Sequence, residues 1–340
     1  MPEPAGNTTP DMDVAQVLDL VTAAWRSRAL YAAVTLEVPD LIAEGAVTDA
    51  DIAARTGADP DRIHRLMRLL VALDVFAGGP EGYRLTPASQ LLRRDAPGSL
   101  RGLCVLYGEE FHRAWDCLVP AIRDGRSGFE SAFGRSLHEH LTDQPGAGRK
   151  FLDAMNAANE SFAAVPHAFD FTAARTVVDV AGGSGLLLSL ILRAHPHLHG
   201  VLFDRAAMAS VAEQQLADCL TADRYTVCSG DMFAALPADA DVYVLARVLQ
   251  DWDDDRGVRL LRRCREAMTP TARLMVVERL VGGPDTDLLP LLWDLHLMVA
   301  AGGRERTLPE YRRLLNTAGL RIVRTVPLPL QSSLIVAAPA

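Results

Sequence analysis

The feature that most constrains the fold lies after Phe171, where short runs rich in β-branched residues alternate with stretches of helical character. Five such runs occur: TVVDV (176–180), GVLF (200–203), YTVC (225–228), DVYVL (241–245) and LMVVE (274–278). Continuous apolar strands separated by helices are typical of a parallel sheet buried on both faces. Two further runs, Arg321–Val326 and Ser333–Ala337, are expected to close this sheet as a terminal hairpin. The sequence therefore predicts an α/β domain over residues 171–340.

The first hundred residues have a different pattern, in which helical spacing of apolar residues dominates and only one short β-ribbon is expected. Apolar residues recur at helical spacing in two neighbouring segments, and two capped helices follow before a Gly-Gly-Pro turn. These elements are expected at residues 14–21, 29–36, 48–57, 60–70 and, for the ribbon, 75–86. Helices followed by a hairpin are typical of a winged-helix domain, expected over residues 13–106. Residues 1–12 are interpreted as a disordered leader.

A winged helix raises the alternative of DNA binding, because Arg62, Arg65 and Arg68 recur every third residue on the candidate recognition helix. Residues 1–100, however, hold 9 Arg, no Lys and 14 Asp or Glu, a net charge of -5. The whole chain carries -9, with a pI of about 5.5. A negative surface disfavours a phosphate backbone as partner. We therefore expect a dimerisation role and no nucleic acid.

The bulk composition excludes several other classes. At 340 residues the chain is long for one core, and no apolar run approaches the roughly 20 residues that span a bilayer. The N-terminus lacks the basic and apolar parts of a signal peptide, so a cytoplasmic protein without membrane association is expected. Five scattered cysteines without a CxxC pair indicate reduced thiols. His195, His197 and His199 lack an acidic or thiol partner nearby, so no metal is expected, and His138-Glu139-His140 is interpreted as solvated.

Residues 107–170 are expected to form a helical linker. Phe151, Met155 and Phe162 supply large apolar side chains, with Asn156 and Asn159 between them. Core packing is one interpretation, and the roof of a substrate pocket is the other.

Three features at successive strand ends carry the chemistry. The segment Val177–Gly185 ends the first strand in a Gly-rich turn, where the backbone approaches a ligand without a Cβ in the way. Asp204 ends the second strand, at the position where a carboxylate accepts bonds from ribose hydroxyls. Asp231 follows the third strand, beside the apolar Met232 and Phe233, and is suited to receive an adenine amino group. Together they predict a nucleoside-containing ligand.

At this point the sequence resembles the S-adenosylmethionine-dependent O-methyltransferases of plant phenolics and bacterial aromatic antibiotics. The resemblance covers nearly the whole chain and is carried by DVAGGSG, GVLFD, GDMF, VLQDWDDDRGVRLLRRCREAM and AGGRERT. It implies a Rossmann-like class I methyltransferase domain, an all-helical winged-helix dimerisation domain, a homodimer, and S-adenosyl-L-methionine as cofactor.

The resemblance also implies site residues. Those that match cofactor-binding positions are Gly182, Gly183, Gly185, Asp204, Asp231, Met232, Phe233, Arg247 and Trp252. The candidate catalytic group is Gln250, Asp251, Glu278 and Glu305, of which the two glutamates match acidic positions that flank a catalytic histidine in many members. Candidate substrate-binding residues are Phe151, Met155, Asn159, Asp294 and Met298.

Two positions depart from the family pattern. Ala181 stands where the first loop glycine is expected, and Gln250 stands where the family carries its general base, histidine. An amide takes up no proton near neutral pH, so Gln250 serves only to hydrogen-bond and position a substrate. His296 is considered as a substitute base, although packing is the simpler interpretation.

We therefore expect methyl transfer to oxygen or to an activated carbon of a small aromatic or polyketide-like natural product. Gln250 keeps open an enzyme that binds the cofactor but catalyses hydroxylation, decarboxylation or cyclisation. A DNA-binding regulator that senses a small molecule is the third, least favoured interpretation.

Overall fold

The structure is a computed structural model that describes residues 10–144, 146–282 and 288–340. Two compact units divide the chain between Glu109 and Glu110. Most of the leader predicted at residues 1–12 lies outside the described residues, and the first helix begins at Pro10.

The first unit contains helices and one hairpin, as the sequence predicts, but its two expected N-terminal helices are one. Helix α1 runs without a break for 26 residues. The prediction of separate helices is wrong because residues 22–28 contain neither Pro nor Gly to end the first one. The elements are α1 (Pro10–Thr35), α2 (Val38–Ala43), α3 (Asp49–Thr56), α4 (Pro60–Ala72), β1 (Phe76–Gly79), β2 (Gly82–Leu85), α5 (Pro87–Gln90) and α6 (Arg101–Gly108).

Local signals set the bounds of these helices. Thr48 caps α3 in a capping box with Asp51, and Gly57 ends the helix in the left-handed conformation, as predicted. Asp59 caps α4 ahead of Pro60. The hairpin turn requires Gly78, whose φ is 98° and whose Cβ would lie 2.2 Å from a backbone oxygen.

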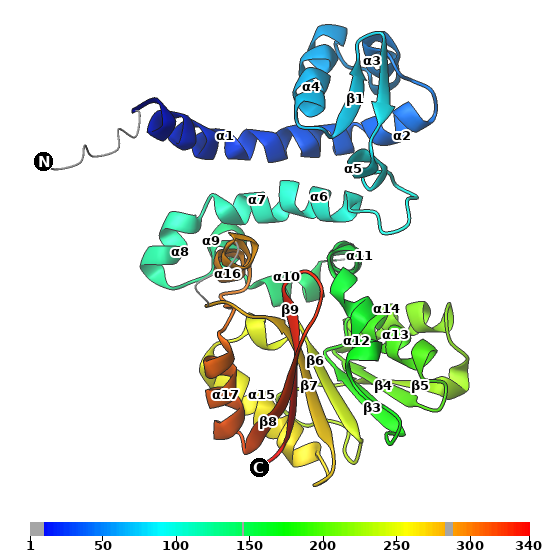
Figure 1. Cartoon of the computed structure of the whole chain (residues 1–340), viewed down its shortest axis with the longest axis vertical. Coiled ribbons are helices and arrows are strands. Elements are labelled where there is room, and N and C mark those ends of the chain that lie inside the picture. The colour runs from blue at the N-terminus through cyan, green and yellow to red at the C-terminus, as the bar shows by residue number, and fades with distance from the viewer. Residues whose placement is uncertain (1–9, 145, 283–287) are drawn as a thin grey trace, which may run out of the picture. The chain divides into compact units, whose positions relative to one another are not determined.

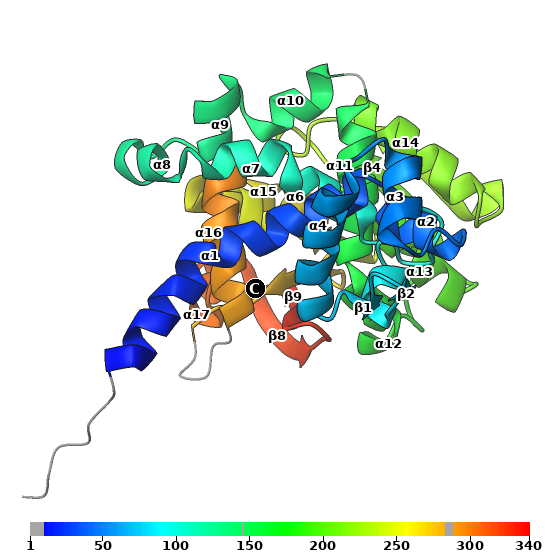
Figure 2. The same ribbon diagram turned by 90° about the horizontal axis from the view of Figure 1, so that it is seen from above.

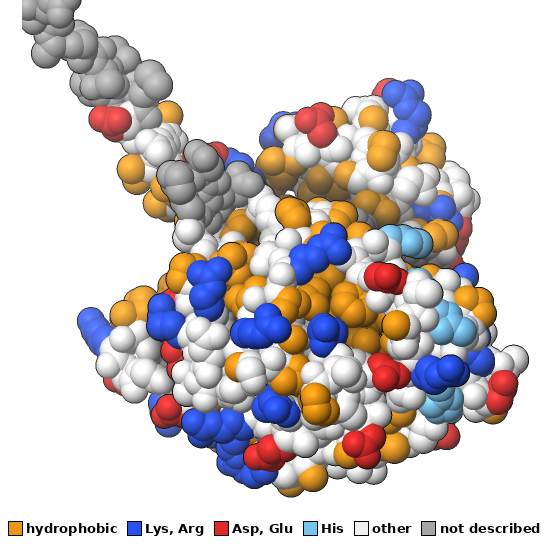
Figure 3. Space-filling model, turned by 60° about the horizontal axis from the view of Figure 1, so that its bottom comes forward, with side chains coloured by type: hydrophobic (Ala, Val, Ile, Leu, Met, Phe, Trp, Pro, Cys, Tyr) orange, Lys and Arg blue, Asp and Glu red, His pale blue; other side chains and the backbone are white. Residues whose placement is uncertain are grey.

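Helix α1 leaves a long apolar surface uncovered within one chain. Helices α2–α4 gather around its C-terminal end, while its N-terminal part extends away from them (Figure 2). Hydrophobic side chains are visible on that part in Figure 3. Each of the four residues of the predicted stripe is more than half exposed: Val14, Val17, Leu18 and Val21. Since single exposed apolar residues are common but a continuous row is not, this row is a candidate protein interface.

The second unit begins with short helices and continues into an α/β domain (Figure 1). The helical part contains α7 (Glu110–Trp115), α8 (Leu118–Asp124), α9 (Gly128–Phe133), α10 (Leu137–Asp143), α11 (Ala147–Ala158), the 3-10 helix η1 (Glu160–Ala164) and α12 (Val165–Ala168). Ser127 and Ser136 start α9 and α10 with capping boxes that use Glu130 and Glu139.

All seven predicted strands are present, each within two residues of its expected bounds. They are β3 (Thr176–Val180), β4 (His199–Asp204), β5 (Tyr225–Ser229), β6 (Val242–Ala246), β7 (Arg273–Arg279), β8 (Leu320–Pro327) and β9 (Ser332–Pro339). They form one sheet in the order β5-β4-β3-β6-β7-β9-β8. The first five strands are parallel, and β9 pairs antiparallel with both β7 and β8.

Both faces of the sheet are buried by helices. Alternate residues of one strand face opposite ways, so Val178 packs in one core cluster and Val177 in the other. The first cluster is completed by α15 (Asp254–Ala267) and α17 (Leu308–Thr317), and the second by α13 (Leu186–Ala194) and α14 (Ala206–Ala217). The remaining elements are η2 (Ala222–Arg224), η3 (Leu249–Asp251) and α16 (Leu288–Ala300). The strand order reverses between β3 and β6, and open α/β sheets bind ligands at the carboxyl ends of the strands beside such a reversal.

Within the described residues, no helix combines the length and apolar character needed to cross a membrane.

Candidate active site

The Gly-rich loop follows β3 and has an unusual backbone. Gly183 and Gly185 have φ values of 59° and 81°, the left-handed region that glycine tolerates. Ala181 also has a positive φ, 55°, where an L-residue with a Cβ is strained. Gly182 has no room for a side chain, since its Cβ would lie 2.8 Å from the Asp179 carboxyl group.

Two carboxyl groups lie beside this loop. The Gly183 N–H donates to Asp204 Oδ2 at 2.9 Å, and the Arg205 N–H donates to Asp204 Oδ1 at 2.6 Å. A carboxylate has about four acceptor sites, so Asp204 keeps capacity for a ligand hydroxyl. Asp179 is buried, and its Oδ2 has no hydrogen-bond partner among the residues that the structure describes. Burial raises the pKa of Asp179 to about 7, and the charge of Asp204 adds to the shift.

The end of β5 carries the next part of the site. Asp231 is exposed, and its Oδ1 accepts the Phe233 N–H at 2.9 Å in a local turn. The Phe233 ring meets the edge of Trp252, with 5.0 Å between centroids. His138 of α10 stacks on Trp252 at 4.8 Å and 14°, and burial lowers the pKa of His138 to about 4. The structure thus brings Asp231, Phe233 and Trp252 to one edge of the sheet.

The loop that carries Gln250 leaves the end of β6 and is fixed from two directions. Glu278 at the end of β7 accepts backbone N–H groups from Val248, Leu249 and Gln250 at 3.1, 2.9 and 3.4 Å. The Gln250 carbonyl accepts the Arg304 N–H at 2.7 Å. Glycine is required at position 303, because a Cβ there would lie 2.1 Å from the backbone carbonyl oxygen of Gln250.

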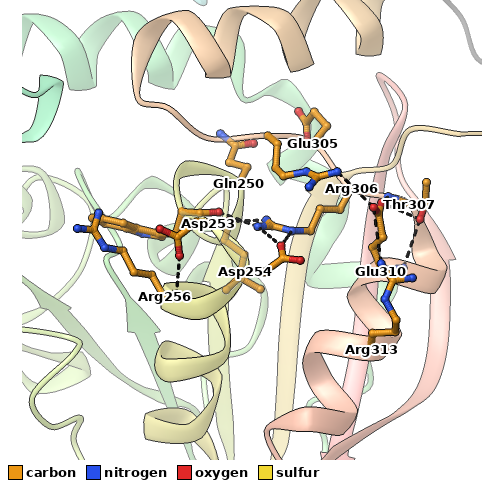
Figure 4. Close-up of polar contacts among 12 residues, drawn as sticks. Gln250, Asp253, Asp254, Arg256, Glu305, Arg306, Thr307, Glu310 and Arg313 are labelled. Carbon is orange, nitrogen blue, oxygen red and sulfur yellow. Dashed lines mark hydrogen bonds and ion pairs between the residues drawn. The ribbon is translucent and has the colours of Figure 1, made fainter. Parts of the chain in front are cut away.

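Arg306 holds the same loop through its carbonyl groups. Its side chain is 1% exposed, and its Nη1 and Nη2 donate to the carbonyls of Leu249 and Trp252 at 2.9 and 2.7 Å. It also donates twice to Asp254 Oδ1, at 2.9 and 2.8 Å. In Figure 4 the guanidinium of Arg306 points toward Asp254, while the Gln250 and Glu305 side chains point to the other side of the loop.

Arg247 joins the two buried glutamates. It has a positive φ of 59°, and its Nη2 donates to Glu305 Oε1 at 3.3 Å, while Nη1 lies 3.6 Å from Glu278 Oε2. Burial raises the pKa of Glu278 to about 8 and also raises that of Glu305, and Arg247 opposes both shifts. Burial likewise raises the pKa of Asp251 to about 7, opposed by Arg247.

Gln250 occupies the centre of this region. It is 7% exposed, and no group of the described residues forms a hydrogen bond with its Oε1. A buried amide oxygen without a partner costs free energy that a hydrogen-bonding ligand restores. The loop contacts therefore fix the backbone position of an amide residue where the family carries an imidazole, and its buried Oε1 is a candidate acceptor.

The candidate substrate residues lie on two helices. Phe151, Met155 and Asn159 are partly buried on or beside α11, and this helix contacts the Gly-rich loop because Ser184 Oγ donates to Asn156 Oδ1 at 2.7 Å. Asp294 and Met298 lie on α16, where Asp294 Oδ1 accepts the Glu305 N–H at 2.7 Å. Their contact with substrate stays a prediction.

His296 sits in an aromatic cluster on α16. Its Nδ1 accepts the Trp115 indole N–H at 3.1 Å, and its ring meets Phe111 edge-on at 4.7 Å. Burial lowers its pKa to about 4, so the imidazole is neutral and weakly basic. These contacts favour the packing interpretation.

The other histidines have structural partners. His195 and His197 contact the carbonyls of Pro166 and Phe171, and His199 contacts that of Asp223. Across the part of the chain that the structure describes, no group of three or more His, Cys, Asp or Glu is arranged to hold a metal. The prediction that His138-Glu139-His140 is solvated is wrong for His138, which is largely buried and stacks on Trp252. Glu139 is exposed and His140 is partly exposed, with its ring 5.3 Å from that of Phe129.

Sequence reasoning missed three contributors to the site: Asp179, His138 and Arg306. Asp179 had a detectable signal, since it is a charge inside an otherwise apolar strand. Arg306 lies within the AGGRERT block, but nothing in the sequence indicates which backbone groups it binds. The stacking of His138 depends on a tertiary contact with no local pattern.

Fold and site together point to a class of enzyme: a Gly-rich loop after β3 and carboxyl groups after β4 and β5 meet at one edge of the sheet, as in enzymes that bind a nucleoside-containing cofactor. A family described as the O-methyltransferase domain matches residues 115–321, and one described as the O-methyltransferase dimerisation domain matches residues 18–95. The chain belongs to the O-methyltransferase family.

Relatives and solved structures agree with this assignment. The chain is 43% identical to a phenazine-1-carboxylate N-methyltransferase of Pseudomonas aeruginosa, over 95% of this chain and 97% of that one. It is 36% identical to the aclacinomycin 10-hydroxylase RdmB of Streptomyces purpurascens, over 94% and 87%. An O-methyltransferase of neocarzinostatin biosynthesis, solved with S-adenosylmethionine and 2-hydroxy-5-methyl naphthoic acid, matches with a TM-score of 0.81 at 34% identity, covering 92% and 96%.

The protein is therefore an S-adenosylmethionine-dependent methyltransferase by family. The donors and acceptors present suit this cofactor: Asp204 has spare acceptor capacity beside the Gly-rich loop, and Asp231 lies beside aromatic side chains. The expected fold, a helical dimerisation domain with a class I methyltransferase domain, is confirmed.

Proposed function

We propose that this chain methylates a small aromatic natural product and does so without a general base. Bound S-adenosylmethionine supplies a methyl group on a positively charged sulfur. Gly182, Gly183 and Gly185 would lie against its methionine part, Asp204 would hold the ribose, and Asp231 with Met232 and Phe233 would hold the adenine. The names of the relatives, which act on aromatic compounds, support this substrate class.

The observation that carries the proposal is the environment of Gln250. Its loop is held by Glu278, Arg304 and Arg306, and its buried Oε1 has no partner. A side chain held in this way aligns an acceptor, and alignment alone can supply roughly 7–11 kcal/mol of rate acceleration. Because the amide takes no proton, the acceptor atom must present a lone pair without help from this residue.

The test is single-turnover methyl transfer across pH 6–9 with aromatic acceptors. We expect the wild type to form S-adenosylhomocysteine, and Gln250→Ala to slow the step without weakening cofactor binding. Gln250→His should not increase the rate for an acceptor that has no proton to lose. A large gain for Gln250→His with a neutral hydroxyl acceptor would show that a base is required, contrary to the proposal.

A second candidate is a non-methylating reaction on the same cofactor site. It is favoured by the replacement of the base by Gln250 and by a 36% identical relative that is named as a hydroxylase. Mass spectrometry separates the two candidates. A hydroxylated, decarboxylated or cyclised product without S-adenosylhomocysteine supports this one.

We also propose that the chain is a homodimer through the exposed row on α1. The match to a dimerisation domain and the exposure of Val17 and Val21 support this. Replacing both by Glu should yield monomers in sedimentation analysis, whereas an unchanged dimer would exclude this row. A salt-dependent, sequence-selective gel shift by the intact protein would instead favour the DNA-binding regulator. The segment bounds 1–12, 13–106, 107–170 and 171–340 and a cytoplasmic location stay predictions.

A further inference from the structure

Helix α11 (Ala147–Ala158) lies against the Gly-rich loop through two residues that are one turn apart. Ser184 Oγ donates to Asn156 Oδ1 at 2.7 Å. One turn earlier, Leu152 is buried, and its Cδ2 lies 3.0 Å from the point that a Cβ on Gly183 would occupy. Residues four apart lie on the same face of a helix, so this face of α11 follows the loop.

Ser184 is also part of the internal structure of the loop. It is 3% exposed, and its Oγ accepts the Leu186 N–H at 3.3 Å, at the start of α13. Because a hydroxyl both donates and accepts, hydrogen bonds run from α13 through the loop to α11. The position of Asn156 therefore depends on the conformation of the loop.

A ligand that binds the loop restricts this conformation. Ala181, Gly183 and Gly185 all have positive φ values, so the loop adopts a backbone geometry that most residues avoid. In the proposed function the methionine part of the cofactor lies against this loop. Restricting the loop also restricts the segment that is hydrogen-bonded to it, so we expect α11 to respond to the cofactor.

Helix α11 has few local features that stabilise it. Gly146 precedes it in the left-handed conformation and provides no side-chain cap. Among the described side chains of the helix, Leu152 and Ala154 are buried, and the others are partly or fully exposed. A helix of 12 residues is marginal in water without tertiary contacts. Its order therefore depends on the groups that hold it in place.

Polar contacts with other elements hold α11 at both ends. Near its N-terminus, Lys150 Nζ donates to Glu110 at 2.9 Å, and Arg149 Nη1 donates to Gln214 Oε1 at 3.2 Å. Toward its C-terminus, the polar contact is that of Asn156 with the Gly-rich loop. The C-terminal half of α11 is therefore tied to the part of the site that receives the cofactor.

We propose that Asn156 is a positioning residue that couples cofactor binding to acceptor binding. When the cofactor occupies the Gly-rich loop, Asn156 orders the C-terminal half of α11 through Ser184. It thereby positions Phe151 and Met155, the candidate acceptor contacts on this helix. This inference rests on the proposed function and adds that cofactor and acceptor bind cooperatively, each strengthening the binding of the other by the same factor.

The test is hydrogen exchange of the full-length protein, with and without saturating S-adenosylhomocysteine, read by mass spectrometry. In the wild type, this ligand should slow exchange of the amides of residues 152–157 by about tenfold or more. Asn156→Ala should reduce the effect on α11 to less than about threefold, while the slowing at residues 182–186 remains. Asn156→Asp keeps an oxygen that accepts from Ser184 and should retain the slowing of α11.

Asn316 provides the matched control. Asn316→Ala makes the same change at an exposed position of α17 and should leave the protection of α11 unchanged. Alanine favours a helix more than asparagine does, so a purely local effect of either change would stabilise its own helix. Loss of protection in Asn156→Ala alone therefore reports the lost hydrogen bond.

A second variant keeps the test decisive if Asn156→Ala unfolds the chain. Ser184→Ala removes the same hydrogen bond from the side of the loop and should also remove the protection of α11. The double variant should lose no more of this protection than either single variant. Equal protection of α11 in the wild type and both variants would overturn the proposal, as would a wild-type α11 that does not respond to S-adenosylhomocysteine.

Steady-state kinetics with a methylated aromatic acceptor gives a second readout. Asn156→Ala should raise the acceptor KM by about fivefold or more, because the cofactor no longer helps to position Phe151 and Met155. The Kd of S-adenosylmethionine in the absence of acceptor should change less than this KM. The opposite result, a weakened cofactor with an unchanged acceptor KM, would make Asn156 a support of the cofactor loop alone and would refute the coupling.

Failure of this inference is distinct from failure of the proposed function. A protein that forms S-adenosylhomocysteine with an aromatic acceptor, and whose α11 does not respond to this product, keeps its methyltransferase function and loses the role of Asn156. A protein whose α11 is protected through Asn156, but which methylates no aromatic acceptor, loses the proposed function and keeps the link between α11 and the cofactor loop.

Discussion

Replacing Arg306 by methionine should destabilise the second unit and loosen the loop that carries Gln250. Methionine keeps most of the volume of the side chain but removes all four of its hydrogen bonds. Two of these bonds go to carbonyl groups of the loop, those of Leu249 and Trp252. Each buried acceptor left without a donor costs about 1–3 kcal/mol.

The contribution of Asp254 is smaller. The Asp254 side chain is 53% exposed, so water screens much of its interaction with the buried guanidinium. The two carbonyl groups give an expected loss of about 2–6 kcal/mol for Arg306→Met. Asp254→Asn should lose less than Arg306→Met.

The assay is urea unfolding of both variants, together with cofactor titration and methyl transfer under conditions in which the variants stay folded. We expect Arg306→Met to lower kcat more than it weakens cofactor binding, because Asp204 and the Gly-rich loop are untouched. If Arg306→Met costs no more than Asp254→Asn, the carbonyl contacts contribute nothing, and the account of how the loop is held is wrong.

Three further predictions concern the rest of the site and its surroundings. Ala181→Gly should raise the free energy of unfolding by up to about 1 kcal/mol. Glycine relieves the left-handed strain (about 1–2 kcal/mol), and this gain exceeds the free-energy cost of the more flexible unfolded chain. A lower free energy of unfolding in urea would contradict this. Asp204→Ala and Asp231→Ala should each weaken S-adenosylmethionine at least tenfold in calorimetry, and unchanged affinity in both would remove the adenosine site from these residues. The unfolded chain protonates His296 near pH 6.5 but the folded chain only near pH 4, so His296 should contribute about 3 kcal/mol to the stability lost on acidification through this window. His296→Phe should reduce the decline by that amount and leave the contribution of His138; parallel pH profiles of variant and wild type would argue against the shift.

The sequence by itself determined the strands, the Gly-rich loop and most helix ends. These features depend on local physics: Val177 and its neighbours form a continuous apolar run, Thr48 caps a helix, and Gly57 ends it. Asp204 and Asp231 were also predictable, because the carboxyl ends of parallel strands meet at one edge of a sheet.

The tertiary structure alone decided which side chains hold which groups. Arg306 binds carbonyls more than fifty residues away in sequence, and Glu278 binds N–H groups of a loop that leaves the neighbouring strand. No periodicity encodes such contacts, since they depend on where two distant segments meet. The same is true of the buried acidic side chains around Gln250: the sequence shows that a base is absent, but only the packed structure shows that Glu278 and Glu305 are buried beside Arg247 in this region.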